Sequence, residues 1–219
     1  MASQPTPCLF EPAKDTDADA IYELAFASPQ PFLRRVERAD INTWLATDDW
    51  MCWVAKDRST GQLLAVCNLK VPEVKAGEPP EPGEFGGLFT DPQARGRGVG
   101  RRLAIFALGA YFWDTDPDGP NPLPMLAHVH RLNSAPRQIL GDLGFRLKRA
   151  IEVPGGTPGF EHMPTNDAGV VLGDEFTFPA EQRASLFETL ADLLDDPSDS
   201  FDVPVGMTSS ELRSLAAGS

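Results

Sequence analysis

The chain is poor in cysteine and tyrosine and contains no long hydrophobic run. Its 219 residues include three cysteines, Cys8, Cys52 and Cys67, whose spacing matches neither a metal site nor a redox motif. Such thiols favour a reduced, cytoplasmic protein in which they are small buried side chains. No apolar run approaches the roughly 20 residues of a membrane-spanning helix, and the first residues, Met-Ala-Ser-Gln-Pro, do not resemble a secretory signal. We therefore expect a cytoplasmic protein that does not enter a membrane.

Basic residues are scarce in the C-terminal part. From Ile151 onward there are 13 acidic residues and two basic ones, Arg183 and Arg213, so this part carries −11 of the net charge of −13 and residues 1–150 carry −2. General nucleic-acid binding is disfavoured, because neutralising phosphates needs a basic face. Two interpretations of the acidity stay open: a solubilising surface, or a surface that attracts a cationic amine substrate or a basic protein partner.

One segment does concentrate glycine and arginine. Residues 90–102 read Thr-Asp-Pro-Gln-Ala-Arg-Gly-Arg-Gly-Val-Gly-Arg-Arg, between a strand predicted over 85–89 and an apolar helix that begins near Val99. The glycines leave N–H groups bare at the helix start, where the helix dipole also favours an anion. Guanidinium groups suit phosphate oxygens, and four are present, on Arg95, Arg97, Arg101 and Arg102. The segment predicts a phosphate-binding loop.

Two common nucleotide-binding motifs do not match this loop. A dinucleotide fingerprint needs Gly-x-Gly-x-x-Gly and an acidic residue about 20 positions later at the end of a strand. Here Arg101 stands at the third glycine position, and Asp116 lies in a loop rich in Asp and Pro. The chain has no Gly-Lys-Ser/Thr sequence, which excludes a Walker loop.

The pattern Gln93-x-x-Gly96-x-Gly98 resembles the acyl-coenzyme A signature of the Gcn5-related N-acetyltransferases (GNAT). In that family a strand and an Asn-led helix ending in Gly-Phe follow the signature helix, and 125–129, Asn133 and Gly144-Phe145 supply these features in order. The resemblance covers about residues 8–153. It implies an α/β (α+β) fold with a mixed, mostly antiparallel central sheet flanked by helices, in the order strand, two helices, four strands, helix, strand, helix, strand.

The sequence also predicts where the domains and the secondary-structure elements begin and end. We expect a GNAT acyltransferase core over 1–153 and an acidic C-terminal extension over 154–219. The extension would contain a final strand over 169–178, an amphipathic helix from Ala180, and a mobile tail that includes 195–205 and a short helix after a capping box at Thr208. We expect the helix stripe to pack on the chain's own sheet, with a homodimer contact as the alternative. The predicted N-terminal elements are a strand at 8–11, helices at 15–26 and 33–45, a hairpin of 51–55 with 63–71, and a proline-rich loop at 72–82.

The resemblance implies an acyl-CoA-dependent N-acyltransferase. Such an enzyme transfers acetyl from acetyl-CoA to a primary amine by direct attack and without a metal, and the amine belongs to a small molecule or to a protein. The backbone N–H of Leu88 would polarise the thioester carbonyl. By the same resemblance the cofactor-binding residues are Leu88, Phe89, Thr90, Arg95, Gly96, Arg97, Gly98, Val99, Gly100, Arg101 and Asn133. The Asn133 side chain could also cap the helix that follows it.

The sequence identifies the general acid and base less clearly than the cofactor-binding residues. We expect Glu84 to be the base, with an exposed strand-edge acid as the alternative, and His130 to serve as acid or base. His128 lies two residues earlier and so on the same face of a strand. Many GNAT members have a tyrosine where this chain has Leu140. Of the two tyrosines, Tyr111 is expected in the core, whereas Tyr22 is a core or surface residue that could reach a substrate pocket. The alternative function is therefore a non-catalytic acyl-CoA-binding or regulatory protein.

Overall fold

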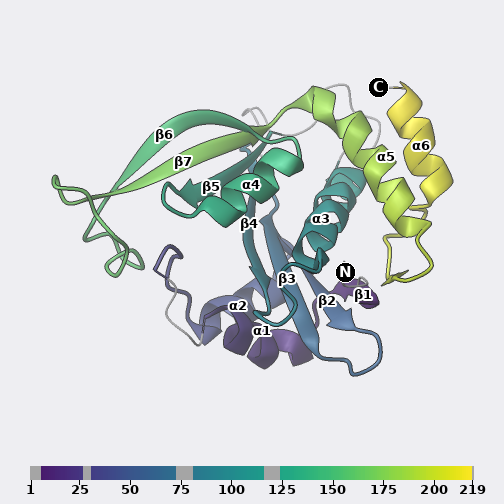
Figure 1. The fold of residues 1–219 in the computed structure, drawn as a ribbon, viewed down its shortest axis with the longest axis horizontal. Helices are drawn as coiled ribbons and strands as arrows, with labels where there is room; N and C mark the ends of the chain where they lie inside the picture. The colour runs from purple at the N-terminus through teal and green to yellow at the C-terminus, as the bar shows by residue number, and fades with distance from the viewer. Residues whose placement is uncertain (1–5, 27–30, 73–80, 116–123, 219) are drawn as a thin grey trace.

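The computed structural model describes residues 6–26, 31–72, 81–115 and 124–218, which are built around one eight-stranded sheet (Figure 1). The strands are β1 (Cys8–Pro12), β2 (Trp50–Asp57), β3 (Leu63–Lys70), β4 (Gly83–Thr90), β5 (Met125–His130), β6 (Arg146–Pro154), β7 (Val170–Phe178) and β8 (Ser200–Phe201). Their order across the sheet is β6-β7-β5-β4-β3-β2-β1-β8. The β4–β5 and β1–β8 pairs are parallel and the other five are antiparallel. The predicted mixed, mostly antiparallel sheet is confirmed.

Six α-helices surround this sheet in the described parts of the chain. They are α1 (Ala18–Ala25), α2 (Arg38–Ala46), α3 (Val99–Thr115), α4 (Ser134–Asp142), α5 (Arg183–Leu194) and α6 (Ser209–Gly218). Cys67 and Leu69 of β3 pack toward α3, and Val66 packs toward α1 and α2, as expected when successive side chains of a strand point to opposite faces. Within the described residues, no helix has both the length and the apolar character needed to cross a bilayer.

The apolar stripe of α5 packs inside this chain, although on a helix and not directly on the sheet. Leu186, Phe187 and Leu190 are buried, and α5 lies against α3 with α6 beside it (Figure 1). A Cβ at Gly109 of α3 would overlap the Leu190 side chain, so glycine permits the close approach of the two helices. The buried side chains of the stripe thus contact other parts of the same chain. A homodimer stays a prediction, and its interface would have to use other surfaces.

Helix capping explains where two helices begin. The helix predicted from residue 33 starts at Arg38, because the Glu37 N–H donates to the Asp40 carboxylate at 2.9 Å in a capping box. The C-terminal helix begins at Ser209. Thr208 accepts the N–H of Glu211 at 3.2 Å and donates its hydroxyl to the Glu211 carboxylate at 2.7 Å, so the structure shows one half of the predicted capping box.

Between α2 and α3 the described residues contain three strands, where the resemblance implied four. The predicted proline-rich loop at 72–82 falls mostly outside the described residues.

The strand predicted to be the last one lies inside the sheet. β7 pairs with both β5 and β6, although it follows them in the chain. The predicted boundary at residue 153 falls at the end of β6, and both neighbours of β7 precede it. The C-terminal part of the chain therefore contributes an internal strand to the same sheet.

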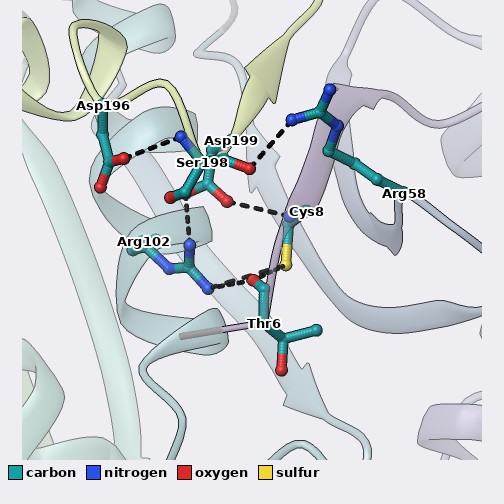
Figure 2. Close-up of polar contacts among 7 residues, drawn as sticks. All are labelled: Thr6, Cys8, Arg58, Arg102, Asp196, Ser198 and Asp199. Atoms are coloured by element: carbon teal, nitrogen blue, oxygen red, sulfur yellow. Dashed lines mark hydrogen bonds and ion pairs between the residues drawn. The ribbon is translucent and has the colours of Figure 1, made fainter. Parts of the chain in front are cut away.

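The segment 195–205, which the sequence predicted to be mobile, is anchored to the first strand (Figure 2). Its short strand β8 pairs in parallel with β1. The Asp199 carboxylate, with a side chain that is 0% exposed, accepts the N–H of Cys8 at 2.9 Å and forms an ion pair with Arg102 of α3. Arg102 also donates to the carbonyl of Thr6 at 3.0 Å. One buried carboxylate thus joins β1, α3 and the C-terminal segment.

We predict that Asp199→Ala lowers the free energy of unfolding by about 3–5 kcal/mol, because it leaves the Arg102 guanidinium buried without its partner. Urea denaturation measures the change. The matched control is Asp192→Ala, which removes an exposed ion pair with Arg213 and is expected to cost at most about 1 kcal/mol. Equal effects of the two substitutions would show that the buried ion pair does not stabilise the fold.

Candidate active site

The strands β4 and β5 pair over only two residues and then separate. Gly83 lies opposite Met125 and Glu84 opposite Leu126, after which both strands continue without further pairing to each other. A cavity of about 90 Å³ opens there and is lined by residues of β4, β5 and α4, among them Gly87, Leu88, Val129, Asn133, Pro136 and Leu140. We call this opening the groove. The facing edges of two central strands are thus exposed to a ligand-sized space.

A β-bulge changes the course of β4 beside the groove. Val66 of β3 lies opposite Phe89 and Asn68 opposite Gly86, so Gly87 and Leu88 together face a single residue of β3. Gly87 has φ +55°, and a Cβ there would overlap the Asn68 side chain, so the position requires glycine. A bulge leaves part of a strand's backbone outside the ladder. The backbone irregularity falls on Leu88, the residue predicted to polarise a carbonyl.

The glycine- and arginine-rich loop connects β4 to α3. Gly96 and Gly98 have φ values of +73° and +74°, in the left-handed region that favours glycine. Gly100 is pressed against Thr90, and a Cβ on Gly100 would overlap the Thr90 hydroxyl. The N–H groups of 96 and 98–101 donate to no backbone carbonyl of the described residues. They are free donors at the start of a helix, the arrangement that binds anions.

The four arginines of the loop are not equivalent. Arg95, Arg97 and Arg101 are exposed; Arg95 is held loosely by the Thr90 carbonyl at 3.4 Å, and Arg97 by the Thr6 hydroxyl at 3.3 Å. Arg102 is used in the buried ion pair with Asp199. The prediction that Arg102 helps to bind phosphate was therefore wrong, because its guanidinium points toward β1 and β8 (Figure 2).

These features fit a thioester that carries a diphosphate. Bare N–H groups and three exposed guanidinium groups lie at the end of β4, and the groove runs along the same strand. Among the described residues, no three His, Cys, Asp or Glu side chains gather closely enough to hold a metal ion.

A larger cavity of about 460 Å³ lies on the α1–α2 side of the sheet. We call it the acceptor cavity. It shares part of its lining with the groove, including Phe32, Phe85, Gly86, Gly87, His128 and His130. The two spaces therefore meet where β4 and β5 separate, so that two ligands could reach each other there.

Three titratable side chains form a row across β4, β5 and β7 at this meeting point. The His128 ring places Nδ1 3.0 Å from Glu84 Oε1 and Nε2 3.3 Å from Glu175 Oε2. The hydrogen bond with His128 lowers the pKa of Glu84, and the same bond raises the pKa of His128. The buried Glu175 also binds Arg149 at 2.9 Å, and its hydrogen bonds, that with Arg149 foremost, lower its pKa to about 2. The row favours ionised carboxylates on both sides of a protonated His128.

The predicted His130 lies nearby but in a different environment. Its Nδ1 accepts the N–H of Leu132 at 3.1 Å, and its Nε2 lies 3.4 Å from the carbonyl oxygen of Pro164. The ring also packs against Phe32, with centroids 4.8 Å apart. The histidine in contact with Glu84 is therefore His128, which the sequence reasoning did not select. The sequence did show that His128 lies two residues from His130 and so on the same face of the strand. Which of the two histidines meets Glu84 depends on the stagger of β4 and β5.

Other predicted residues divide between the groove and the core. Asn133 precedes α4, but its side chain makes no capping hydrogen bond, and it lines the groove with Leu140. Tyr111 is fully buried beside Gly83, as expected, and burial raises its pKa to about 12. Tyr22 is absent from the described lining of both cavities. Within the described residues, then, no tyrosine reaches the groove.

Residues 18–113 match the family model described as "Acetyltransferase (GNAT) family", and solved structures of that family share the fold. The matched segment is thus similar to the GNAT acetyltransferase family. A comparison with curated proteins gives no significant match.

Three solved GNAT structures show how far the similarity extends. Arabidopsis thaliana NAA60 in complex with acetyl-CoA is 15% identical with a TM-score of 0.58, covering 78% of this chain and 97% of that one. The ribosomal-protein-S18-alanine N-acetyltransferase from Escherichia coli is 13% identical with a TM-score of 0.55, covering 78% and 93%. A variant of spermidine N-acetyltransferase from Vibrio cholerae is 14% identical with a TM-score of 0.53, covering 86% and 97%.

The GNAT family binds acetyl-CoA and acetylates amines. These low identities establish the fold alone. The acceptor of this protein must therefore be argued from its own cavity.

We predict that His128→Gln destabilises the protein most between the ordinary pKa values of Glu84 and His128, 4.5 and 6.5, and least at a pH above the raised pKa of His128 in the folded state. The raised pKa of His128 gives stability that is present below its ordinary value of 6.5 and is lost as the pH rises through the pKa of the folded state. The lowered pKa of Glu84 gives stability that is present above 4.5 and is lost on acidification. Urea denaturation at several pH values measures the difference between wild type and variant. A difference independent of pH would contradict the assigned pairing of Glu84 with His128.

Proposed function

We propose that this protein is an acyl-CoA-dependent N-acyltransferase that transfers acetyl from acetyl-CoA directly to a primary amine of a small molecule or a protein. The observation that carries the proposal is the meeting of the groove and the acceptor cavity beside Gly86, Gly87 and His128. A thioester in the groove and an amine in the cavity would approach from opposite sides, so no acyl-enzyme is needed. We place the protein in the cytoplasm, because its three cysteines are buried and free.

The cofactor-binding assignment follows the elements around the groove. Acetyl-CoA, when bound, supplies an acyl group activated as a thioester. Leu88 would donate its backbone N–H to the thioester carbonyl, and Phe89 and Thr90 would continue along the pantetheine arm. Asn133 lines the groove on the opposite side. The diphosphate would lie against the bare N–H groups of Gly96, Gly98, Val99, Gly100 and Arg101, with the guanidinium groups of Arg95, Arg97 and Arg101 around it.

Proton transfer would centre on Glu84 and His128. The attacking nitrogen forms a C–N bond as the C–S bond breaks; the nitrogen must lose a proton, and the sulfur must gain one. Glu84, which lines the acceptor cavity, would accept a proton directly or through water, and His128, which lines both spaces, would carry a proton where they meet. The sequence suggested His130 for such a step. We prefer His128, because its ring contacts the Glu84 carboxylate, whereas the ring nitrogens of His130 face main-chain groups of Leu132 and Pro164.

A non-catalytic acyl-CoA-binding or regulatory protein is the second candidate. Leu140 favours it, because this buried aliphatic side chain lines the groove where many relatives carry a tyrosine that protonates the leaving thiolate. Such a protein would bind the cofactor and release no thiol.

We predict that the double substitution Arg97→Ala with Gly98→Asp weakens acetyl-CoA binding at least about 100-fold in isothermal titration. It removes a guanidinium, forces a side chain into a positive φ, and places a carboxylate beside the phosphates. Arg213→Ala is the matched control, because Arg213 pairs with Asp192 and Asp195 far along the chain and its loss should leave the affinity unchanged. Equal affinity of wild type and double variant would remove the proposed cofactor site.

We also predict that Glu84→Gln lowers kcat by roughly 10²- to 10⁴-fold, the usual contribution of a general base, without weakening acetyl-CoA binding. Thiol release on a panel of amines measures kcat, and titration measures binding. Glu152→Gln, on an exposed position of β6, is the control. Tight cofactor binding by the wild type with no thiol release from any amine would favour the non-catalytic candidate.

A further inference from the structure

We infer that the acceptor is a primary amine carried on an apolar body, aromatic or aliphatic, without a second positive charge. This inference rests on the proposed function and concerns the acceptor cavity alone.

The wall of the acceptor cavity is made mainly of large apolar side chains. Phe26 at the end of α1, Trp44 of α2 and Trp50 of β2 line one side, and Phe160 and Met163 come from the chain between β6 and β7. These four rings are only partly buried by the protein itself. An apolar ligand would therefore remove existing apolar surface from water, which is the main source of affinity in such pockets.

The rings on this side support one another. The Phe26 and Phe89 centroids are 4.9 Å apart at an interplanar angle of 68°, and those of Trp44 and Trp50 are 5.4 Å apart. Phe26 also meets Trp44 edge to face, with centroids 6.1 Å apart. An aromatic cage for a cation turns several ring faces toward one point. Here the edges and faces of the rings contact one another, so much of each ring surface is already occupied by a neighbouring ring and the rings form a continuous apolar wall.

Among the described residues, the charges that line the cavity leave no partner for a second ammonium group. The only acidic side chain among its described lining residues is Glu84, which is held by His128 and is needed for the reacting amine. The exposed Arg34 also lines the cavity, and its charge helps to lower the pKa of Glu84. A diamine or polyamine would bring its second charge to an apolar wall or toward a guanidinium. An unpaired charge moved out of water is costly.

Two amines of equal length test the inference. Hexan-1-amine and pentane-1,5-diamine have the same number of non-hydrogen atoms and differ by a methyl group in place of a second ammonium. We expect kcat/KM for hexan-1-amine to exceed that for the diamine on the order of 100-fold, and 2-phenylethan-1-amine to be at least as good as hexan-1-amine. Acetyl-CoA at saturation and thiol release provide the measurement.

A charge reversal at Arg34 tests the same inference, and the same change at the neighbouring Arg35 is its control. Arg34→Glu places a carboxylate at the cavity and should move the kcat/KM ratio about tenfold toward the diamine. Arg35→Glu makes the same charge change one residue away, where the side chain pairs with Glu37 and is not among the cavity-lining residues. The control should leave the ratio unchanged.

The outcomes separate the two proposals. If the diamine is acylated as well as hexan-1-amine, or better, the inference about the acceptor is overturned and the proposed function stands. If no amine is acylated, the proposed function fails, and titration of the same two amines into protein saturated with coenzyme A decides the inference. Tighter binding of the monoamine supports an apolar-amine cavity, whereas equal or tighter binding of the diamine overturns it.

Discussion

The separation of β4 from β5 after two residue pairs is the constraint on which the site depends. A sheet normally satisfies the N–H and C=O groups of its central strands, and leaving them unpaired in the interior is costly. Here the strands part beside Gly86 and Gly87, and the bulge opposite Cys67 turns the backbone of Leu88 out of the regular ladder. The β4 backbone therefore has hydrogen-bonding capacity that the protein itself leaves unused. An extended amide-bearing ligand, such as a pantetheine arm, would satisfy that capacity.

The same separation explains why charged groups gather on one face. Across β3, β4, β5, β7 and β6 neighbouring side chains alternate in sign: Lys70, Glu84, His128, Glu175 and Arg149. Glu84 lies opposite Leu126 in the register and reaches His128 through its hydrogen bond. Cross-strand neighbours of opposite charge stabilise a sheet, and like charges destabilise it. His128 is the only link between two carboxylates in this row, so its charge is set by both. A residue that needs a proton for structural reasons at the edge of a cavity is also well placed to exchange one.

The sequence predicted the parts of this molecule that depend on local rules. The glycines of the loop, the period of α3 and the order of most strands follow from short stretches of chain. Glu84 was correctly placed at the start of β4. The sequence analysis selected His130, and no local rule could correct that choice, because period two puts both histidines on one face and only the stagger of neighbouring strands decides which one meets Glu84. Asp199 gave no signal either: its partner Arg102 is 97 residues away, and β8 has only two residues.

The position of that aspartate changes how the acidic C-terminal part is understood. Neither interpretation from composition, a solubilising coat or a surface that attracts cations, describes its buried acids. Asp174 pairs with Arg131 and Arg137, Glu175 with Lys148 and Arg149, and Asp199 with Arg102. Each of these carboxylates is buried and neutralises basic side chains from the first 150 residues. Three of the 13 acidic residues after Ala150 are therefore used in buried ion pairs and do not belong to an acidic surface. The Asp199 pair also removes one arginine from the loop that faces the phosphates, and this fixes the first turn of α3 while three guanidinium groups stay free for a ligand.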